Sequence, residues 1–174
     1  MTHLTKAVLL IAALAVSACT NPNRFDNVDA GAGAGAGTGI DGGIIPGSAN
    51  DPTSTAYFQQ AIGDRVFFAV DQSTLSPEAR ATLDQQAQWL MTNSDYLAVI
   101  EGHADEQGTR EYNIALGARR ANAVMEYLTS KGIAASRLKF ISYGKERPVE
   151  ICSVESCYAK NRRAVTVISM GLGS

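Results

Sequence analysis

The turn at residues 101–108 holds the side chains best suited to chemistry, because His103 precedes Asp105 by two positions. A histidine next to a carboxylate can bind a metal ion or move protons. A zinc site needs a third and usually a fourth ligand, but the only other histidine is His3 and no cysteine lies near in sequence. No serine or cysteine nucleophile motif accompanies the turn. We therefore expect no metal site, no cofactor and no enzymatic activity, and interpret His103 as a turn residue with local hydrogen bonds.

Two cysteines near the C-terminus, Cys152 and Cys157, are five positions apart in a polar stretch. In an exported protein such a pair is expected to form a disulfide, because the compartment is oxidising. The ring that it closes is small, so the bond should stabilise the fold by about 2 kcal/mol. The alternative is a pair of reduced thiols, because the sequence does not fix the geometry.

The third cysteine, Cys19, ends an N-terminal export signal. Residues 1–6 carry one lysine and no acid, and residues 7–16 form an apolar run too short to cross a bilayer as a helix. Small residues then lead directly to Cys19, as in a lipobox, whose cysteine becomes a lipid-modified N-terminus. Thr20 follows in place of an aspartate, which favours delivery to the outer membrane. We expect residues 1–18 to be a lipoprotein signal peptide; a plain signal peptide with a coincidental cysteine is the alternative.

Residues 19–56 are interpreted as a lipidated N-terminus followed by a flexible tether. Small and polar residues dominate, with alternating glycine and alanine at 31–37. Such a stretch buries too little apolar surface to offset the entropy lost on ordering. As a coil it would span about 35 Å. Glycines at 37–42 match the dinucleotide-binding fingerprint in spacing, but no strand precedes them and no helix follows, so we reject that interpretation.

The charge balance excludes one class of partner. The 174 residues carry a net charge of −2, and 18% of them are charged. Proteins that bind nucleic acids normally show a clear basic excess. We therefore expect no nucleic-acid partner.

Residues 57–174 carry the periodic elements of one domain. Strands are predicted at 65–70, 96–100, 138–143 and 164–168, and helices at 77–93 and 110–131, with a short polar helix or loop before the last strand. Ser76 and Thr109 are suited to cap the two helices, and Gly132 to end the second. The core stripe expected on the second helix is Ile114, Ala118, Ala121, Met125 and Leu128. This order predicts an α/β (α+β) sandwich with two main helices packed on one mixed four-stranded sheet.

Three stretches in this domain resemble the OmpA-like domain family. They are EGHADEQGTREYNIALGARRANAV at 101–124, SYGKERP at 142–148 and NRRAV at 161–165. The similarity extends over about residues 63–169, and three long motifs in the same order make it specific. Together with the lipobox and the tether, the motifs resemble the lipoprotein branch of the family, which belongs to the Tol–Pal system.

The resemblance implies non-covalent binding of peptidoglycan through the meso-diaminopimelate of its stem peptide. The free end of that residue is a zwitterion, so a site for it needs an acid and a base close together. By resemblance, Asp105 accepts from the ammonium group and Arg120 holds the carboxylate. Helix geometry puts Asn113 and Leu116 on the face of Arg120, while Arg119 points about 100° away. The further residues implied are Asp71 and Arg162.

One departure and three alternatives accompany this interpretation. Ala69 stands where many family members carry aspartate, so only a backbone contact is possible there. Asp105 and Arg120 are alternatively a structural salt bridge, and Arg162 and Arg163 are alternatively caps of the preceding loop. The resemblance also implies TolB and other Tol proteins as partners, a periplasmic domain and a role in cell division. A protein-binding adaptor that has lost wall binding is the competing function.

Overall fold

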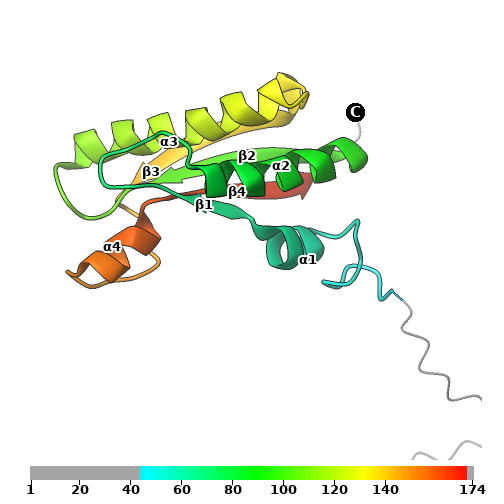
Figure 1. Cartoon of the computed structure of the whole chain (residues 1–174), viewed down its shortest axis with the longest axis horizontal. Helices are drawn as coiled ribbons and strands as arrows, with labels where there is room; N and C mark the ends of the chain where they lie inside the picture. The colour runs from blue at the N-terminus through cyan, green and yellow to red at the C-terminus, as the bar shows by residue number, and fades with distance from the viewer. Residues whose placement is uncertain (1–43, 172–174) are drawn as a thin grey trace, which may run out of the picture. The chain divides into compact units, whose positions relative to one another are not determined.

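The computed structural model describes residues 44–171, which form one α/β unit (Figure 1). The expected signal peptide, Cys19 and most of the expected tether lie outside these residues. Between residues 44 and 171, no helix is long and apolar enough to cross a membrane.

The sheet contains four strands in the described part of the chain, and it confirms the predicted mixed topology. The strands are β1 (Arg65–Phe67), β2 (Tyr96–His103), β3 (Leu138–Gly144) and β4 (Arg163–Met170), in the spatial order β1-β4-β2-β3. β2 and β3 are parallel, while β4 is antiparallel to both β1 and β2. The end of β2 therefore lies beside the start of β4, and this pairing joins the 101–108 turn to the 161–165 motif.

Two long helices, α2 (Pro77–Thr92) and α3 (Arg110–Ser130), share one hydrophobic core with the sheet (Figure 1). The predicted caps are confirmed, because Ser76 Oγ accepts from the Ala79 amide and Thr109 Oγ1 accepts from the Tyr112 amide. The shorter elements are α1 (Thr55–Tyr57), η1 (Phe58–Gly63), η2 (Ala135–Arg137) and α4 (Glu155–Asn161). The expected short helix between β3 and β4 is α4.

The first strand is shorter than predicted. β1 ends at Phe67, and the Phe68 amide makes one more bond, 2.9 Å long, to the carbonyl of Arg162. Beyond it the backbone turns away from the sheet, and Asp71 has a φ of 54°. That left-handed conformation does not fit an extended ladder, so residues 68–70 form a loop despite their apolar side chains.

The buried face of α3 differs from the predicted stripe. Ala121 and Leu128 are buried as expected, but the centre of the face is occupied by small and polar residues; its buried members also include Asn113, Leu116, Gly117, Arg120 and Val124. At Gly102 a Cβ atom would lie 1.9 Å from the Gly117 carbonyl oxygen, so helix and strand touch through their backbones. A search for apolar periodicity does not detect a face of this kind.

The packed domain begins before residue 57, where the composition places its start. The Trp89 indole donates to the Pro52 carbonyl at 2.7 Å, and the Tyr96 hydroxyl donates to the Thr53 carbonyl at 2.9 Å. Ser54 is buried and caps α1 through a bond from the Tyr57 amide. The last residues of the expected tether are thus attached to α2 and β2.

Candidate functional site

A cavity of about 230 Å³ lies where the loop after β1, the turn after β2 and the start of α3 meet. Four of the six binding residues expected from the sequence line it, namely Asp71, Asp105, Asn113 and Leu116. The other lining residues are Val70, Gln107, Gly108 and Tyr112. The structure therefore brings together residues that lie more than forty positions apart in sequence.

The turn after β2 holds Asp105 against the cavity. Asp105 Oδ1 accepts from the Gln107 amide at 3.2 Å, and Asn113 Nδ2 donates to the Gln107 carbonyl at 2.8 Å. Gly108, with a φ of 89°, allows the chain to reverse before α3 begins. The Asp105 side chain is only 10% exposed. The turn is thus built to present a largely desolvated carboxylate at a fixed position.

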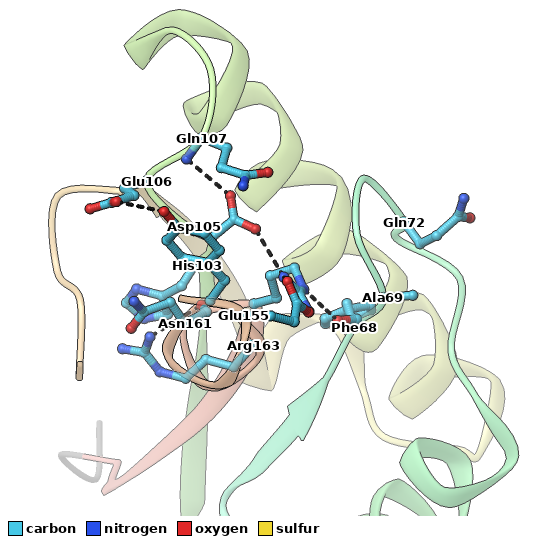
Figure 2. Close-up of polar contacts among 12 residues, drawn as sticks. Phe68, Ala69, Gln72, His103, Asp105, Glu106, Gln107, Glu155, Asn161 and Arg163 are labelled. Carbon is cyan, nitrogen blue, oxygen red and sulfur yellow. Dashed lines mark hydrogen bonds and ion pairs between the residues drawn. The ribbon is translucent and has the colours of Figure 1, made fainter. Parts of the chain in front are cut away.

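The basic partner of Asp105 is Arg162. Arg162 Nη1 lies 3.2 Å from Asp105 Oδ2, and its Nε donates to the Phe68 carbonyl at 3.2 Å. The same guanidinium makes an ion pair with Glu155 of α4. Figure 2 shows Asp105 between the Gln107 amide on one side and the guanidinium beside Glu155 on the other. Arg163 does not join this group, because its guanidinium donates to the carbonyls of Asn161 and Arg147.

Arg120 does not line the cavity, and among the described residues it makes no salt bridge with Asp105. Its side chain is fully buried and donates to three carbonyls, those of Gln72 (2.8 Å), His103 (2.8 Å) and Ala69 (3.1 Å). Burial lowers the pKa of Arg120 to about 10, with nearby Asp105 acting in the opposite direction. The side chain is therefore cationic at neutral pH, and it ties the loop after β1 to the end of β2.

The loop wall of the cavity carries backbone strain. Asp71 is the one non-glycine residue between 44 and 171 with a positive φ, a conformation that aspartate tolerates better than most side chains. The Tyr112 hydroxyl donates to the Asp71 carboxylate, and this bond raises the pKa of Tyr112. The bond links the loop to α3 across the cavity. The Ala69 backbone contact that the sequence left possible is the one to Arg120.

The interpretation of His103 as a locally hydrogen-bonded turn residue is wrong. His103 is the last residue of β2, is 1% exposed, and has no hydrogen-bond partner for either ring nitrogen within residues 44–171. Its ring stacks on Tyr143, with centroids 5.6 Å apart. Burial, together with the positive charges of Arg163 and Arg147, lowers the pKa of His103 to about 4. The ring is therefore neutral at pH 7 and serves as packing.

Sequence reasoning missed several residues of this site. Gln107 and Gly108 lie inside the quoted motif, so that motif already contained a signal for them. Tyr112 also lies inside the motif, but its role depends on the conformation of Asp71, which the motif does not indicate. Glu155 reaches Arg162 from a helix that composition only weakly predicts. Cys152 and Cys157, on the same segment, are joined by a disulfide with their Cα atoms 6.0 Å apart.

Several known proteins are similar to this chain in sequence and in fold. Residues 67–162 match the OmpA family. A peptidoglycan-associated lipoprotein of Mesorhizobium japonicum is 52% identical over 168 residues, which are 96% of this chain and 92% of that protein. The peptidoglycan-associated lipoprotein of Burkholderia pseudomallei has a crystal structure with a TM-score of 0.62 and 36% identity, covering 70% of this chain and 98% of that one. The C-terminal domain of Helicobacter pylori MotB, at 21% identity and a TM-score of 0.58, covers 63% and 86%, and shares the fold alone.

Proposed function

This chain belongs to the OmpA family and to its peptidoglycan-associated lipoproteins, and on this premise we propose that it binds peptidoglycan non-covalently. The ligand is the meso-diaminopimelate end of the stem peptide, and it occupies the cavity between Asp71 and Asp105. The observation that carries the proposal is the meeting of Asp71, Asp105, Asn113 and Leu116 at one cavity. The proposed activity is binding, with no chemical step.

The charge distribution supports a zwitterionic ligand. Two carboxylates, of Asp71 and Asp105, line the cavity, while Arg162 pairs with Asp105 and Arg120 donates to carbonyls before and after Asp71 in the loop. The four side chains are close to neutral together, with Asp105 paired to Arg162 and Arg120 bonded only to backbone carbonyls. An ammonium group meets the carboxylates, and a neighbouring carboxylate of the ligand lies in the field of the two arginines. A ligand that carries both charges is therefore attracted by the carboxylates and by the arginines.

The size of the cavity supports recognition of an end group rather than of a whole muropeptide. Cavities for drug-sized molecules are typically about 300–1,000 Å³. At about 230 Å³ this one suits one amino-acid head. Val70 and Tyr112, which are 53% and 43% exposed, offer apolar surface at its rim for the rest of the stem peptide.

The proposal includes an anchor and a set of partners. Acyl chains on Cys19 hold the chain in the outer membrane, the residues between Cys19 and the packed domain span the gap, and the domain faces the periplasm. Three acyl chains bind a bilayer stably, since even two suffice. TolB and other Tol proteins are the protein partners, with TolB competing for the peptidoglycan-binding face, and the complex contributes to envelope constriction at division.

The competing function, a protein-binding adaptor without wall binding, rested on Ala69 alone. The Ala69 carbonyl accepts a bond from Arg120, so the loop is fixed without an acidic side chain at that position. Nothing else between residues 44 and 171 favours the adaptor over wall binding.

Co-sedimentation with diaminopimelate-type sacculi tests the proposal. The full chain, purified in detergent, is expected to pellet with sacculi, and Asp105→Asn to lose at least about tenfold in affinity, because the ammonium then lacks its charged acceptor. Asp95→Asn, at an exposed aspartate just before β2, is the matched control and should pellet like the wild type. Circular dichroism checks that both variants are folded. A wild-type chain that stays in solution would overturn wall binding and favour the adaptor.

A further inference from the structure

Arg162 lies between two carboxylates that come from different parts of the chain. On the cavity side it contacts Asp105 at 3.2 Å, and on the other side Nη1 lies 3.4 Å from Glu155 Oε2 while Nη2 pairs with Glu155 Oε1. Arg162 is 4% exposed, whereas the Glu155 side chain is 67% exposed. The state of Glu155 therefore affects how strongly Arg162 attracts Asp105.

The helix that carries Glu155 has little stability of its own. α4 has seven residues, and its N-cap residue, Val154, makes no capping hydrogen bond. Helices this short are unstable without tertiary support. The Cys152–Cys157 disulfide supplies such support, because it links the residue two before the cap to the first turn of the helix. Glu155 lies inside the ring that the disulfide closes.

Other contacts fix the remainder of the segment. The Tyr158 hydroxyl donates to Glu106 at 2.8 Å, and Asn161 Oδ1 accepts from the Val149 amide at 2.8 Å. These bonds hold the middle and the end of α4 without the disulfide. The first turn, which contains Glu155, is held by the disulfide and by the Ser153 hydroxyl just before it, which donates to Glu106 at 3.0 Å.

We propose that Glu155 is a positioning residue for the cavity, held in place by the Cys152–Cys157 disulfide, and that reduction of this disulfide weakens ligand binding. While Glu155 shares Arg162, Asp105 keeps more of its charge for the ammonium group of the ligand. When Glu155 moves away, Arg162 pairs with Asp105 alone and competes with that ammonium group. The inference rests on the proposed function.

The chemical step is thiol–disulfide exchange with a dithiol. A reductant thiolate attacks one sulfur of the pair, the Cys152–Cys157 bond breaks, and a mixed disulfide forms. The second thiol of the reductant then resolves the mixed disulfide. Both cysteines end as thiols, and the dithiol ends as a disulfide, so two electrons pass from the reductant to the protein.

Calorimetric titration of the full chain in detergent with an L-Ala–D-Glu–meso-diaminopimelate tripeptide tests the inference. Glu155→Gln is expected to bind about fivefold more weakly, the size of effect that a partly exposed ion pair supports. Glu155→Asp should restore part of the affinity. Glu150→Gln is the matched control, at a half-exposed glutamate in the loop before α4 that pairs with Lys160, and should bind like the wild type.

Reduction with dithiothreitol separates positioning from simple stabilisation. Reduction should weaken wild-type binding about fivefold but leave the Glu155→Gln variant unchanged, since both changes act through the same ion pair. The Cys152→Ser/Cys157→Ser double variant should match the reduced wild type. Thermal unfolding, measured in parallel, should show reduction destabilising both proteins equally.

The outcomes distinguish this inference from the proposed function. Equal binding by the wild type and Glu155→Gln, or an equal loss on reduction in both, would overturn the role of Glu155 while leaving peptidoglycan binding in place. A wild-type chain that binds neither the tripeptide nor sacculi would overturn the proposed function, and this inference with it.

Discussion

Two buried arginines serve the same cavity in different ways. Arg120 donates only to neutral carbonyls, from the loop after β1 and from the end of β2. Arg162 contacts two carboxylates, Asp105 and Glu155. The first arginine therefore fixes the shape of the site, because it joins two of its walls. The second controls the electrostatics of the site, because its ion pair with Asp105 offsets part of the negative charge of that carboxylate.

The difference shows that a basic residue in a shared sequence motif need not line the cavity next to that motif. Arg120 reaches carbonyls 48 and 51 positions away, those of Gln72 and Ala69, and it is fully buried. Its positive charge still acts on the cavity, where it interacts with Asp105 and Asp71. We therefore expect Arg120 to affect binding by holding the cavity walls in place and by its positive charge. We expect Arg162 to affect binding because its ion pair with Asp105 competes with the ligand.

Removal of the Arg120 guanidinium should cause the largest loss of stability. Arg120→Met should lower the free energy of unfolding by at least about 4 kcal/mol, because three carbonyls lose their donor in a buried site. Arg120→Lys should fail to rescue it, since one ammonium group does not reproduce the forked geometry. Urea unfolding measures both. Arg119→Ala, at the exposed neighbour, is the control and should change stability by less than about 0.5 kcal/mol. Near-wild-type stability of Arg120→Met would contradict the conclusion that Arg120 fixes the shape of the site while Arg162 controls its charge.

The buried His103, which lies beside Arg120, gives a prediction of how the stability of the fold depends on pH. Its carbonyl accepts from Arg120, while its ring lies near Arg163 and Arg147. The pKa of His103 is about 4 in the fold, below its ordinary 6.5, so the unfolded chain takes up the proton first as the pH falls. The stability from the neutral ring is fully present above pH 6.5 and is lost between pH 6.5 and 4, up to roughly 3 kcal/mol.

Unfolding by urea at a series of pH values checks this slope. His103→Gln should be less stable at pH 7, because the stacking on Tyr143 is lost, but its stability should fall less steeply between pH 6.5 and 4. Glu101, whose Oε2 lies 3.7 Å from His103 Nε2, limits the loss by attracting the protonated ring. A wild-type slope retained in the variant would assign the pH dependence to other groups.

Asp71 should give the smallest effect on stability and a clear effect on binding. Asp71→Asn keeps a side chain that accepts the left-handed backbone and loses only the charge. The free energy of unfolding is expected to stay within about 0.5 kcal/mol, while affinity for the diaminopimelate tripeptide falls about tenfold. Thermal unfolding and calorimetry measure the two quantities. Unchanged affinity would show that Asp105 alone holds the ammonium group.

The fold was largely predictable because its signals are local. Ser76 and Thr109 cap the helices as their sequence positions indicate, and the strands follow from short, mainly apolar stretches. The buried face of α3 was not predictable by the same means, since Gly117 and Arg120 occupy its centre. Periodicity reports apolar side chains, whereas this face is made by a backbone contact and by a buried cation.

Four of the residues that line the cavity were predictable from the sequence, but the ion pair of Asp105 was not. Asp105 and Asn113 reach the cavity as the motif implies, yet the partner of Asp105 is Arg162. The reason is distance along the chain, since Asp105 and Arg162 are 57 positions apart and meet only because β4 pairs with β2. Side-chain bonds to backbone carbonyls, such as those of Arg120, leave no pattern in residue type.

The central claim is that the cavity recognises an ammonium group and a carboxylate together. Calorimetric titration of the full chain with two tripeptides tests it most directly, one ending in meso-diaminopimelate and the other in lysine, which lacks only the second carboxylate. We predict that the first peptide binds and that the second binds at least about tenfold more weakly. The lysine ammonium group can still interact with Asp71 and Asp105, but lysine has no second carboxylate to be attracted by Arg120 and Arg162. Equal affinity for the two peptides would contradict the claim.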